Sequence, residues 1–351
     1  NSAPALFVPI IISSSGIGGS FYTSELTMTN RGAQTATVEL SYMDAFVGGS
    51  GTVTTTLPAG QQRIVPDAIA YLVSLGMPIP ATGNRGGTLR VRFTGLSSSS
   101  DGAVTVRTAT AVASGRAGLA YPGVSTMLAL SGTSFVPGLR QNATDRSNLA
   151  MQHAGTSAQG PITLRLTVFS GNPGSPSQTT LPDVTLNAGD FSQLTLILAG
   201  LNVSNGFVKI DRISGTAPYY AYGVVNDSSN SDGSFIPAIP ENAMTGRSGM
   251  SLPVIVEGAF TSELVLTNWS TQQKVVRFTY VESAQTSNTT PTFSISLNPS
   301  QQAIIPNIFQ YLRSLNTPGI GRLGLTYVGA LFATVDGGDA GGIFLGARTS
   351  T

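Results

Sequence analysis

Two stretches of the sequence nearly repeat each other: residues 21–30 read FYTSELTMTN, and residues 260–268 read FTSELVLTN. Apart from the additional Tyr22, the Thr-Ser-Glu-Leu segment and the final Thr-Asn dipeptide are identical. Such a match is either one ligand site used twice or one structural unit built twice. Because repeated elements usually repeat for packing, we interpret Glu25 and Glu263 as equivalent strand positions facing solvent or a neighbouring loop. A duplicated ligand contact is the alternative.

A second match follows in the same order along the chain. Residues 59–78, AGQQRIVPDAIAYLVSLGMP, realign with residues 299–318, PSQQAIIPNIFQYLRSLNTP. A weaker middle copy begins at Ser134 with SFVPGLRQNATDRSNLAMQHAG, in which Asn148 stands at the position of Glu25. Divided by three, the 351 residues give units of about 115 residues, the size of a β-sandwich domain.

The alternation of apolar and polar residues in each copy predicts β-strands. TSELTMTN places Leu26 and Met28 on one face, and ATVELSYM and TLRVRFTG alternate in the same way. Clusters such as VGGSG and SSSSDG predict turns between these strands. The sequence therefore predicts an all-β protein of three tandem β-sandwich (Ig-like) units, residues 1–124, 125–240 and 241–351.

Two short helices are expected to interrupt the strands, one in the first unit and one in the third. After Pro66, DAIAYLVSL brings its apolar residues near one helical face, with Asp67 as the expected N-cap. NIFQYLRSL after Pro306 shows the same pattern. We expect each helix to plug an open edge or end of its sandwich.

Composition excludes several classes of function. The chain has no cysteine, which excludes disulfides, thiol chemistry and cysteine-based metal sites. Its net charge of +1 gives no excess of positive charge that would bind nucleic acid or an anionic membrane. Charged residues make up only 10%, which weakens the repulsion between copies and favours an extracellular setting or an assembly. The initial NSAPA is typical of a mature end after signal removal, although trimming would look the same.

Few residues are candidates for catalysis. The only histidine, His153, stands where Asn30 and Asn268 stand in the other copies. We interpret it as a strand-end hydrogen-bonding residue rather than the base of a Ser-His-Asp mechanism. The carboxylates show no catalytic motif, although folding can bring together the facing pair that a glycoside hydrolase needs.

Two acidic, glycine-rich turns are weak candidates for a metal site. In NDSSNSDGS, residues 226–234, Asn230 and Asp232 match part of the spacing of a calcium loop. DGGDAGG contributes Asp336 and Asp339. Both stretches are more typical of glycine turns, so we expect no bound metal and no cofactor.

The densest aromatic cluster is APYYAYG, residues 217–223. Adjacent tyrosines can stack on sugar rings, which makes Tyr219, Tyr220 and Tyr222 the candidates for ligand binding. Tyrosine is also an ordinary strand residue, so packing is the preferred interpretation.

The first predicted strand, APALFVPIII, is apolar without strict alternation, which indicates burial on both faces. We expect it to be the first strand of its own sandwich. The rarer alternative is that it completes the sheet of a neighbouring molecule and so builds a filament. The residues that would make this assembly contact are Leu6, Phe7, Val8, Ile10, Ile11 and Ile12.

The segments FVPIII, GGSFYTSELTMTNRG, LPAGQQRIVPDAIAYL, GLRQNATDRSNLA and GTAPYYAYGVVND together resemble a group of large secreted bacterial proteins of unknown role. Those proteins carry tandem β-rich units with a glycine-rich turn before an aromatic-Thr-x-Leu-x-Leu-x-Asn strand. The resemblance covers nearly the whole chain and implies secretion and a β-sandwich array. It carries no catalytic motif and therefore assigns no site residue.

The expected function is that of a non-enzymatic extracellular structural protein, a subunit of a surface, matrix or filament assembly. The expected partner is another copy of the chain or an extracellular polysaccharide. The alternative is a polysaccharide-binding or adhesion module, and the third hypothesis is a hydrolase with an unrecognised carboxylate pair. Neither a nucleic-acid partner nor a membrane span is expected.

Overall fold

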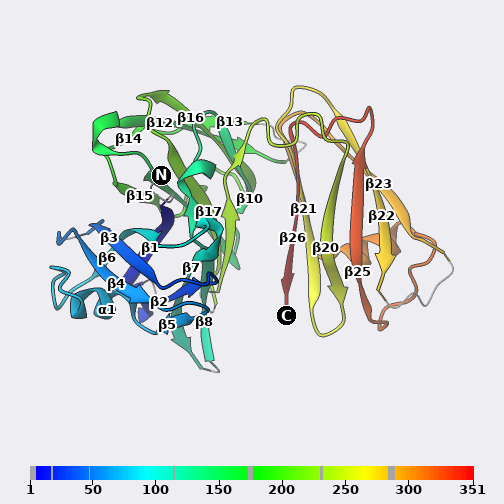
Figure 1. Ribbon diagram of the computed structural model, residues 1–351. Helices are drawn as coiled ribbons and strands as arrows, with labels where there is room; N and C mark the ends of the chain where they lie inside the picture. Colours follow the sequence, from blue (N-terminus) through cyan, green and yellow to red (C-terminus); the bar gives the residue numbers. More distant parts are fainter. Residues whose placement is uncertain are drawn as a thin grey trace.

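The computed structural model describes residues 5–16, 19–46, 48–113, 115–172, 177–229, 232–283 and 289–351. It is nearly all β, which confirms the predicted fold class. The sheets and the buried clusters fall into three stretches of chain, which we call unit 1 (residues 5–125), unit 2 (130–240) and unit 3 (249–350). Figure 1 shows units 1 and 2 packed together, with unit 3 beside them along strand β10.

The elements follow one another in a similar order in the three units. Unit 1 contains β1 (Leu6–Ser15), β2 (Phe21–Asn30), β3 (Ala36–Asp44), β4 (Gly51–Leu57), β5 (Gln62–Val65), α1 (Ala68–Ser74), β6 (Arg85–Thr94), β7 (Gly102–Val112), β8 (Gly115–Pro122) and β9 (Val124–Ser125). Unit 2 contains β10 (Ser134–Arg140), β11 (Asp145–His153), β12 (Ile162–Ser170), β13 (Gln178–Thr180), β14 (Val184–Leu186), β15 (Phe191–Leu194), β16 (Asn205–Ser214), β17 (Tyr219–Asp227), β18 (Gly233–Pro237) and β19 (Ile239–Pro240). Unit 3 contains β20 (Gly249–Glu257), β21 (Thr261–Asn268), β22 (Lys274–Glu282), β23 (Thr292–Leu297), β24 (Gln301–Ile305), α2 (Ile308–Ser314), β25 (Tyr327–Val335) and β26 (Ile343–Ser350). Short 3-10 helices lie at Ser99–Asp101, Thr126–Leu128 and Ser157–Gln159.

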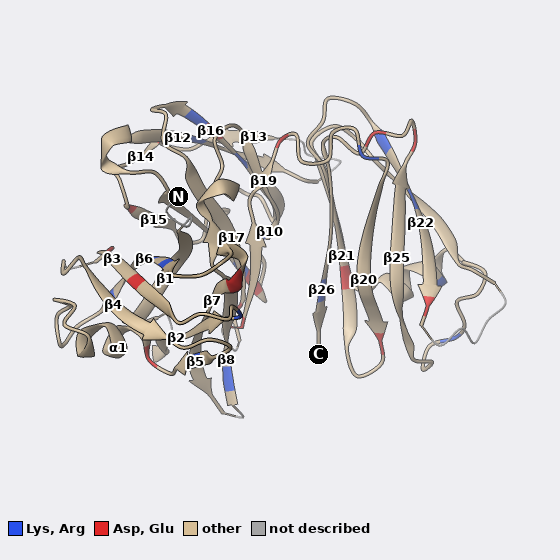
Figure 2. Ribbon diagram, viewed as in Figure 1, with Lys and Arg blue, Asp and Glu red and all other residues tan. Residues whose placement is uncertain are grey.

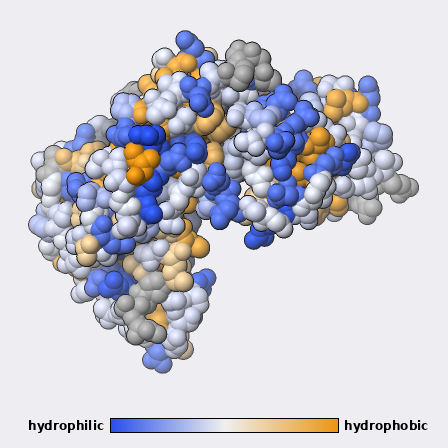
Figure 3. Space-filling view, turned by 90° about the horizontal axis from the view of Figure 1, so that it is seen from above, coloured by the Kyte–Doolittle hydropathy of each residue, from blue (hydrophilic) through white to orange (hydrophobic). Residues whose placement is uncertain are grey.

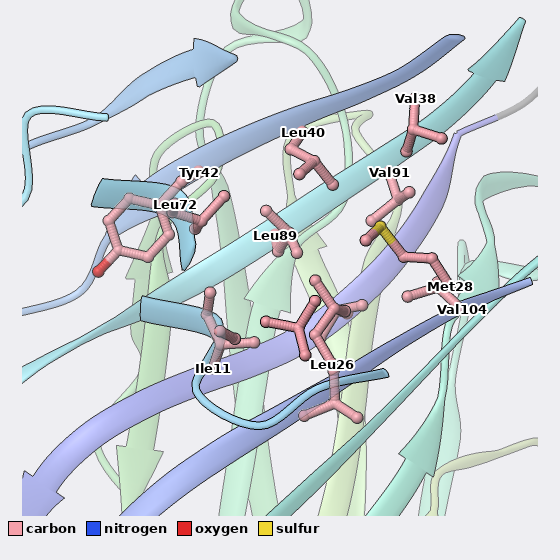
Figure 4. Packing of buried hydrophobic residues seen from close by; sticks show 14 of the residues in the cluster. Ile11, Leu26, Met28, Val38, Leu40, Tyr42, Leu72, Leu89, Val91 and Val104 are labelled. Carbon is pink, nitrogen blue, oxygen red and sulfur yellow. The ribbon is translucent and has the colours of Figure 1, made fainter. Parts of the chain in front are cut away.

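Unit 1 is a sandwich whose two layers are joined through its first strand. The strand order is β4-β3-β6-β1-β2-β7-β8, with β5 on β2 and β9 on β1. β1 pairs with β6 in one layer, and its last residues pair with β2 in the other. The inner side chains of both layers share one core, in which Leu26 and Met28 of β2 lie with Leu89 and Val91 of β6 (Figure 4).

Units 2 and 3 repeat this arrangement with small changes. Unit 2 has two separate sheets, β13-β12-β16-β10-β19, with β14 on β12, and β15-β11-β17-β18. Unit 3 has one sheet, β23-β22-β25-β20-β21-β24, with β26 on β21. β20 and β21 are joined by a single residue pair, Glu257 with Thr261. The second strand pairs with β7 and β5 in unit 1, with β17 and β15 in unit 2, and with β26 and β24 in unit 3, so residues 21–30 and 260–268 occupy the same place.

The same backbone irregularities recur in the three units. The first strands β1, β10 and β20 each carry a register shift around a proline, which has no N–H to donate to the ladder. Opposite this bulge lies a glycine, which is Gly87, Gly206 or Gly329. A Cβ atom at Gly87 would lie 2.1 Å from the main-chain oxygen of Met43, and the other two glycines would meet the corresponding oxygen at 2.4 and 2.3 Å. Only glycine therefore allows β6, β16 and β25 to approach the neighbouring strands β3, β12 and β22 this closely.

Both predicted helices are present, and their N-caps are as expected. Asp67 accepts a hydrogen bond from the N–H of Ala70, and Asn307 accepts one from the N–H of Gln310. α1 packs on β1 and β2, and its buried side chains join the core of unit 1. In unit 2, turns replace the helix at residues 195–202, and Leu196 has a φ of 53° that no helix allows.

Candidate functional site

Charged residues are sparse and scattered over the units (Figure 2). Several carboxylates are engaged by arginines, including the partly buried pair Glu257–Arg313 and the exposed pair Arg165–Asp183. Among the residues that the structure describes, no group of three or more His, Asp or Glu side chains could hold a metal ion. The same residues include no helix of the length and hydropathy that crossing a membrane requires.

The acidic turns predicted as weak metal candidates each have protein partners. Asp336 accepts hydrogen bonds from the Nε and Nη2 of Arg277 at 2.6 and 2.8 Å, which lowers the pKa of Asp336. Asp339 accepts from the main-chain N–H groups of Gly341 and Gly246, which lowers its pKa as well. Asp232 accepts from the N–H of Gly118 at 3.3 Å, so it links unit 2 to unit 1. The remaining candidate, Asn230, lies outside the described residues.

His153 closes the turn that follows β11. The buried ring accepts a hydrogen bond at Nδ1 from the N–H of Gly155, so its Nε2 carries the proton and donates to the carbonyl of Gly160 at 2.9 Å. Asn30 and Asn268, at the same strand position, satisfy main-chain groups of their own turns in the same manner. The strand-end role interpreted from the sequence is therefore confirmed.

The three candidate tyrosines are buried, with exposed fractions of 0% for Tyr219, 8% for Tyr220 and 2% for Tyr222. The hydroxyl of Tyr219 donates to the carbonyl of Gly132 at 2.7 Å inside unit 2, and burial raises its pKa to about 12. Tyr220 and Tyr222 lie in a separate cluster between units 1 and 2, where the ring of Tyr222 is 6.4 Å from that of Tyr121. In this structure the tyrosines are packing residues: Tyr219 lies in the core of unit 2, and Tyr220 and Tyr222 are closed off by the junction.

The first strand, which contains all six assembly candidates, pairs within its own unit. Leu6 and Phe7 pair with β9 on one side, and most of the strand pairs with β6 on the other. Burial on both faces is confirmed, because Phe7 and Val8 point to opposite faces and are 1% and 0% exposed. Phe7 lies under the guanidinium of Arg90, 4.5 Å from its ring centre, rather than in the core of unit 1. β1 is thus a central strand here, with neighbours on both edges.

The junction between units 1 and 2 includes the outer face of the layer that contains β1, in addition to the contacts of β8 with Asp232 and Tyr222. Arg90 of β6 donates to the carbonyls of Ala154 and Gly155, which follow β11. Thr88 of the same strand donates to the carbonyl of Gly189, just before β15, at 3.3 Å. These contacts place the end of β11 and the start of β15 on the outer face of unit 1.

The junction between units 2 and 3 centres on the buried side chain of Gln302 in β24, which is 1% exposed. Its Nε2 donates to the carbonyl of Gly206 at 2.8 Å and to the Oδ1 of Asn205 at 2.7 Å. Its Oε1 accepts from the N–H of Gly138 at 2.7 Å and from the hydroxyl of Thr267 at 2.8 Å. One amide therefore satisfies strands β10 and β16 of unit 2 and strand β21 of unit 3.

Two ion pairs and a ring stack complete this second junction. Arg140 of β10 donates both Nη atoms to the carboxylate of Glu263, and both side chains are nearly buried, at 7% and 12% exposed. Arg348 donates to Asp145 at 2.9 Å. The rings of Phe135 and Trp269 stack with their centres 4.6 Å apart.

Both junctions use equivalent faces. The outer face of the β6 or β16 layer in one unit meets the β11 or β21 layer of the following unit, near its strand ends. This arrangement leaves two faces that the described part of the chain does not cover. We call them the β2 face, on the β5-β2-β7 side of unit 1, and the β25 face, on the β22-β25-β20 side of unit 3.

The two uncovered faces differ in chemistry. The β2 face carries Thr27, Thr29, Gln62 and the 55% exposed Ile64. The β25 face carries apolar side chains that are about half exposed: Val254 (55%), Val281 (45%), Val328 (45%) and Phe332 (48%). Sequence reasoning missed the β25 face, although Val328, Ala330 and Phe332 stand where strict alternation would place polar residues.

A cavity of about 310 Å³ lies where the connection from unit 1 to unit 2 passes the end of β19. It is lined by residues 128–133 and 240–242. Glu241 is the only carboxylate in this lining, so the cavity does not contain the facing pair that glycoside hydrolysis needs.

On the surface seen in Figure 3, hydrophobic residues form small patches separated by hydrophilic ones.

The sequence matches no protein-family model and shows no significant similarity to any curated protein.

Proposed function

We propose that this chain is a non-enzymatic, extracellular structural protein, one subunit of a surface, matrix or filament assembly. The observation that carries the proposal is that equivalent faces of the units stack on one another. Buried hydrogen bonds and an ion pair hold these faces together. An ion pair and an amide that are buried between two units resist independent motion of those units, because breaking them leaves unpaired polar groups. A stack of units that do not move independently is suited to a structural role, because it keeps its shape under load.

The composition supports the same proposal. Charged residues are 10% of the chain and the net charge is +1, so repulsion between copies is weak. The extracellular setting is proposed from this composition and from the resemblance to secreted repeat proteins. The bacterial origin rests on the resemblance alone.

The glycan-binding alternative depends on tyrosines that are buried at the junction of units 1 and 2 or in unit 2. Exposing Tyr220 and Tyr222 to a sugar would require that junction to open. We therefore propose assembly in preference to polysaccharide binding.

Static and dynamic light scattering over a concentration series, with electron microscopy of the same samples, tests the proposal. We expect ordered particles that grow with protein concentration. A chain that stays monomeric at millimolar concentration would contradict the structural role. Electrophoresis through gels that contain soluble glycans provides the comparison, since a binding module would be retarded there without forming particles.

A further inference from the structure

We infer that the β25 face of one molecule binds the β2 face of a second copy of this chain, in a head-to-tail contact that repeats the junctions inside the chain. The inference rests on the proposed function and names its partner and its two surfaces.

The strand registers show that the β25 face is the face which the two preceding units bury. Gly329 of β25 takes the place of Gly206 in β16, so the next outward residue, Ala330, corresponds to Phe207 of unit 2 and to Thr88 of unit 1. Phe207 is 1% exposed and Thr88 is 3% exposed, because each lies on the outer face of a unit that stacks on the next one. In unit 3 this face has no following unit within the described chain.

The chemistry of the β25 face points to burial against protein. At the position of Phe332, unit 1 has Arg90, which donates to the carbonyls of Ala154 and Gly155, and unit 2 has Lys209, which pairs with Asp211. Unit 3 instead has an aromatic residue that pairs with Ser251 and Thr279 and is 48% exposed, while Val281 pairs with Ala330, the outward residue between Val328 and Phe332. A contiguous exposed apolar face of this kind marks an interaction site on a soluble protein. The cost of leaving it in water is about 25 cal/mol for each Å² of apolar area.

The β2 face repeats the face by which unit 3 docks on unit 2. Gln62 lies opposite Thr29 across β5 and β2, as Gln302 lies opposite Thr267 across β24 and β21. In each pair the threonine hydroxyl donates to the glutamine Oε1, at 3.3 Å in unit 1 and 2.8 Å in unit 3. The amide of Gln62 is thus held in the orientation that Gln302 uses.

The hydrogen-bond partner that Gln62 would need is also available on the opposite face. Gln302 donates to a main-chain carbonyl, that of Gly206, which does not depend on the side chain at that position. Gly329 stands at this position in unit 3. The methyl group of Thr27 and the side chain of Ile64 would cover Val254 and Val328, since a Cβ atom at Gly138 in unit 2 would lie 3.7 Å from Val265 Cγ1 of unit 3.

The two faces belong to different units, so the contact is heterologous and does not close on itself. A contact of this type generates an open filament unless the rotation between copies closes a ring. The stacking order of units in the filament is then 1-2-3-1-2-3.

Sedimentation velocity of the 351-residue chain and of two variants, Phe332→Asp on the β25 face and Ile64→Asp on the β2 face, tests the inference. A buried carboxylate without a partner should weaken the contact at least tenfold. We expect each variant alone to lose concentration-dependent growth. An equimolar mixture of the two should form a dimer that does not grow further, since one intact interface remains in the mixture.

Leu315→Asp is the matched control for Phe332→Asp, because Leu315 is 47% exposed in the same unit and lies at the end of α2, outside both faces. Val73→Asp on α1, 39% exposed, is the control in unit 1. Both controls should assemble as the unchanged protein does. Circular dichroism and thermal unfolding establish that all four variants are folded before association is compared.

Three outcomes would overturn the inference. If Ile64→Asp still dimerises while Phe332→Asp does not, the β25 faces meet each other symmetrically. If the unchanged protein assembles and neither variant affects it, assembly uses other surfaces and the proposed function stands without this contact. If the unchanged protein is monomeric at all concentrations, the proposed function fails together with the inference.

Discussion

Glu25 and Glu263 occupy the same position in equivalent strands, and each stands opposite an arginine of its own sheet, Arg107 or Arg348. They nevertheless have different surroundings. Glu263 turns to Arg140 of unit 2 and forms a nearly buried bidentate ion pair, whereas Glu25 lies on the uncovered β2 face. The duplication that the sequence shows is therefore a duplication of fold, and the contact between units has been added to one copy.

Glu263→Gln should open the junction between units 2 and 3. It leaves the nearly buried guanidinium of Arg140 without a carboxylate, which costs about 3 kcal/mol in the free energy of unfolding. Trp269 is the only tryptophan and stacks on Phe135 at this junction, so its fluorescence during urea unfolding reports the opening directly. Glu25→Gln is the matched control and should change stability by less than about 0.5 kcal/mol. Equal losses in both variants would show that the strand position matters and the ion pair does not.

Gln302→Ala should destabilise the same junction through its main-chain partners. Removing the amide takes the acceptor from the buried N–H of Gly138 and one donor from the carbonyl of Gly206, at a cost of about 2–3 kcal/mol. Gln62→Ala removes the same side chain from an exposed site and should cost less than about 0.5 kcal/mol. Hydrogen exchange of the Gly138 amide, measured by NMR, should accelerate only in the first variant. Unchanged protection of that amide would contradict the assigned role of Gln302.

Alkaline pH should weaken the junction of units 1 and 2. Burial, together with the nearby hydroxyls of Tyr121 and Tyr220, raises the pKa of Tyr222 well above its usual value of 10.0. Because the pKa is higher in the folded state, the stabilisation is complete below pH 10 and is lost as the pH rises through the folded pKa. Tyr222→Phe removes this titration, so its free energy of unfolding should fall less between pH 9 and pH 12 than that of the unchanged protein, by roughly 1–2 kcal/mol. Identical slopes for the two proteins would refute the prediction.

Acidification should weaken the junction of units 2 and 3 through Asp145. Burial alone raises the pKa of this carboxyl, but hydrogen bonds from Arg348, Asn142 and Thr144 outweigh burial and lower the pKa below 3.8. A lowered folded pKa means that the stabilisation is present above pH 3.8 and disappears as the pH falls through the folded value. Asp145→Asn should therefore be less stable at pH 7 and lose less stability between pH 4 and pH 2. Urea unfolding at several pH values measures both effects, and a steeper acid loss in the variant would contradict the assignment.

His153→Asn replaces the histidine by the residue found at the same position in units 1 and 3. Asn30 shows that an asparagine there can satisfy the main-chain groups of the following turn, so we expect the variant to fold with nearly unchanged stability. His153→Ala, which supplies no hydrogen bond to Gly155 or Gly160, should lose about 1–3 kcal/mol. Thermal unfolding compares the two, and equal losses would argue against a hydrogen-bonding role.

Patterns within the sequence predicted the local elements well. The alternation of TSELTMTN and the prolines before DAIAYLVSL and NIFQYLRSL indicate β2, β21, α1 and α2, because side-chain periodicity and N-caps are local properties. The interpretation of Glu263 as facing solvent or a loop was incomplete, since it faces strand β10 of another unit. Tyr220 and Tyr222 occupy outward strand positions, which alternation alone cannot distinguish from exposed ones when a second unit covers them.

The sequence by itself determined that this protein is all β, that two segments repeat, and where its turns and helix caps fall. These follow from the residue types and from the distances between neighbours along the chain. Only the tertiary structure decided which copies of a repeated residue are buried. Gln62 and Gln302 share the same local sequence and the same strand partner, yet one is exposed and the other lies at the centre of a junction. The difference arises because burial depends on which faces of separate sandwiches meet, and no pattern within a single strand records that.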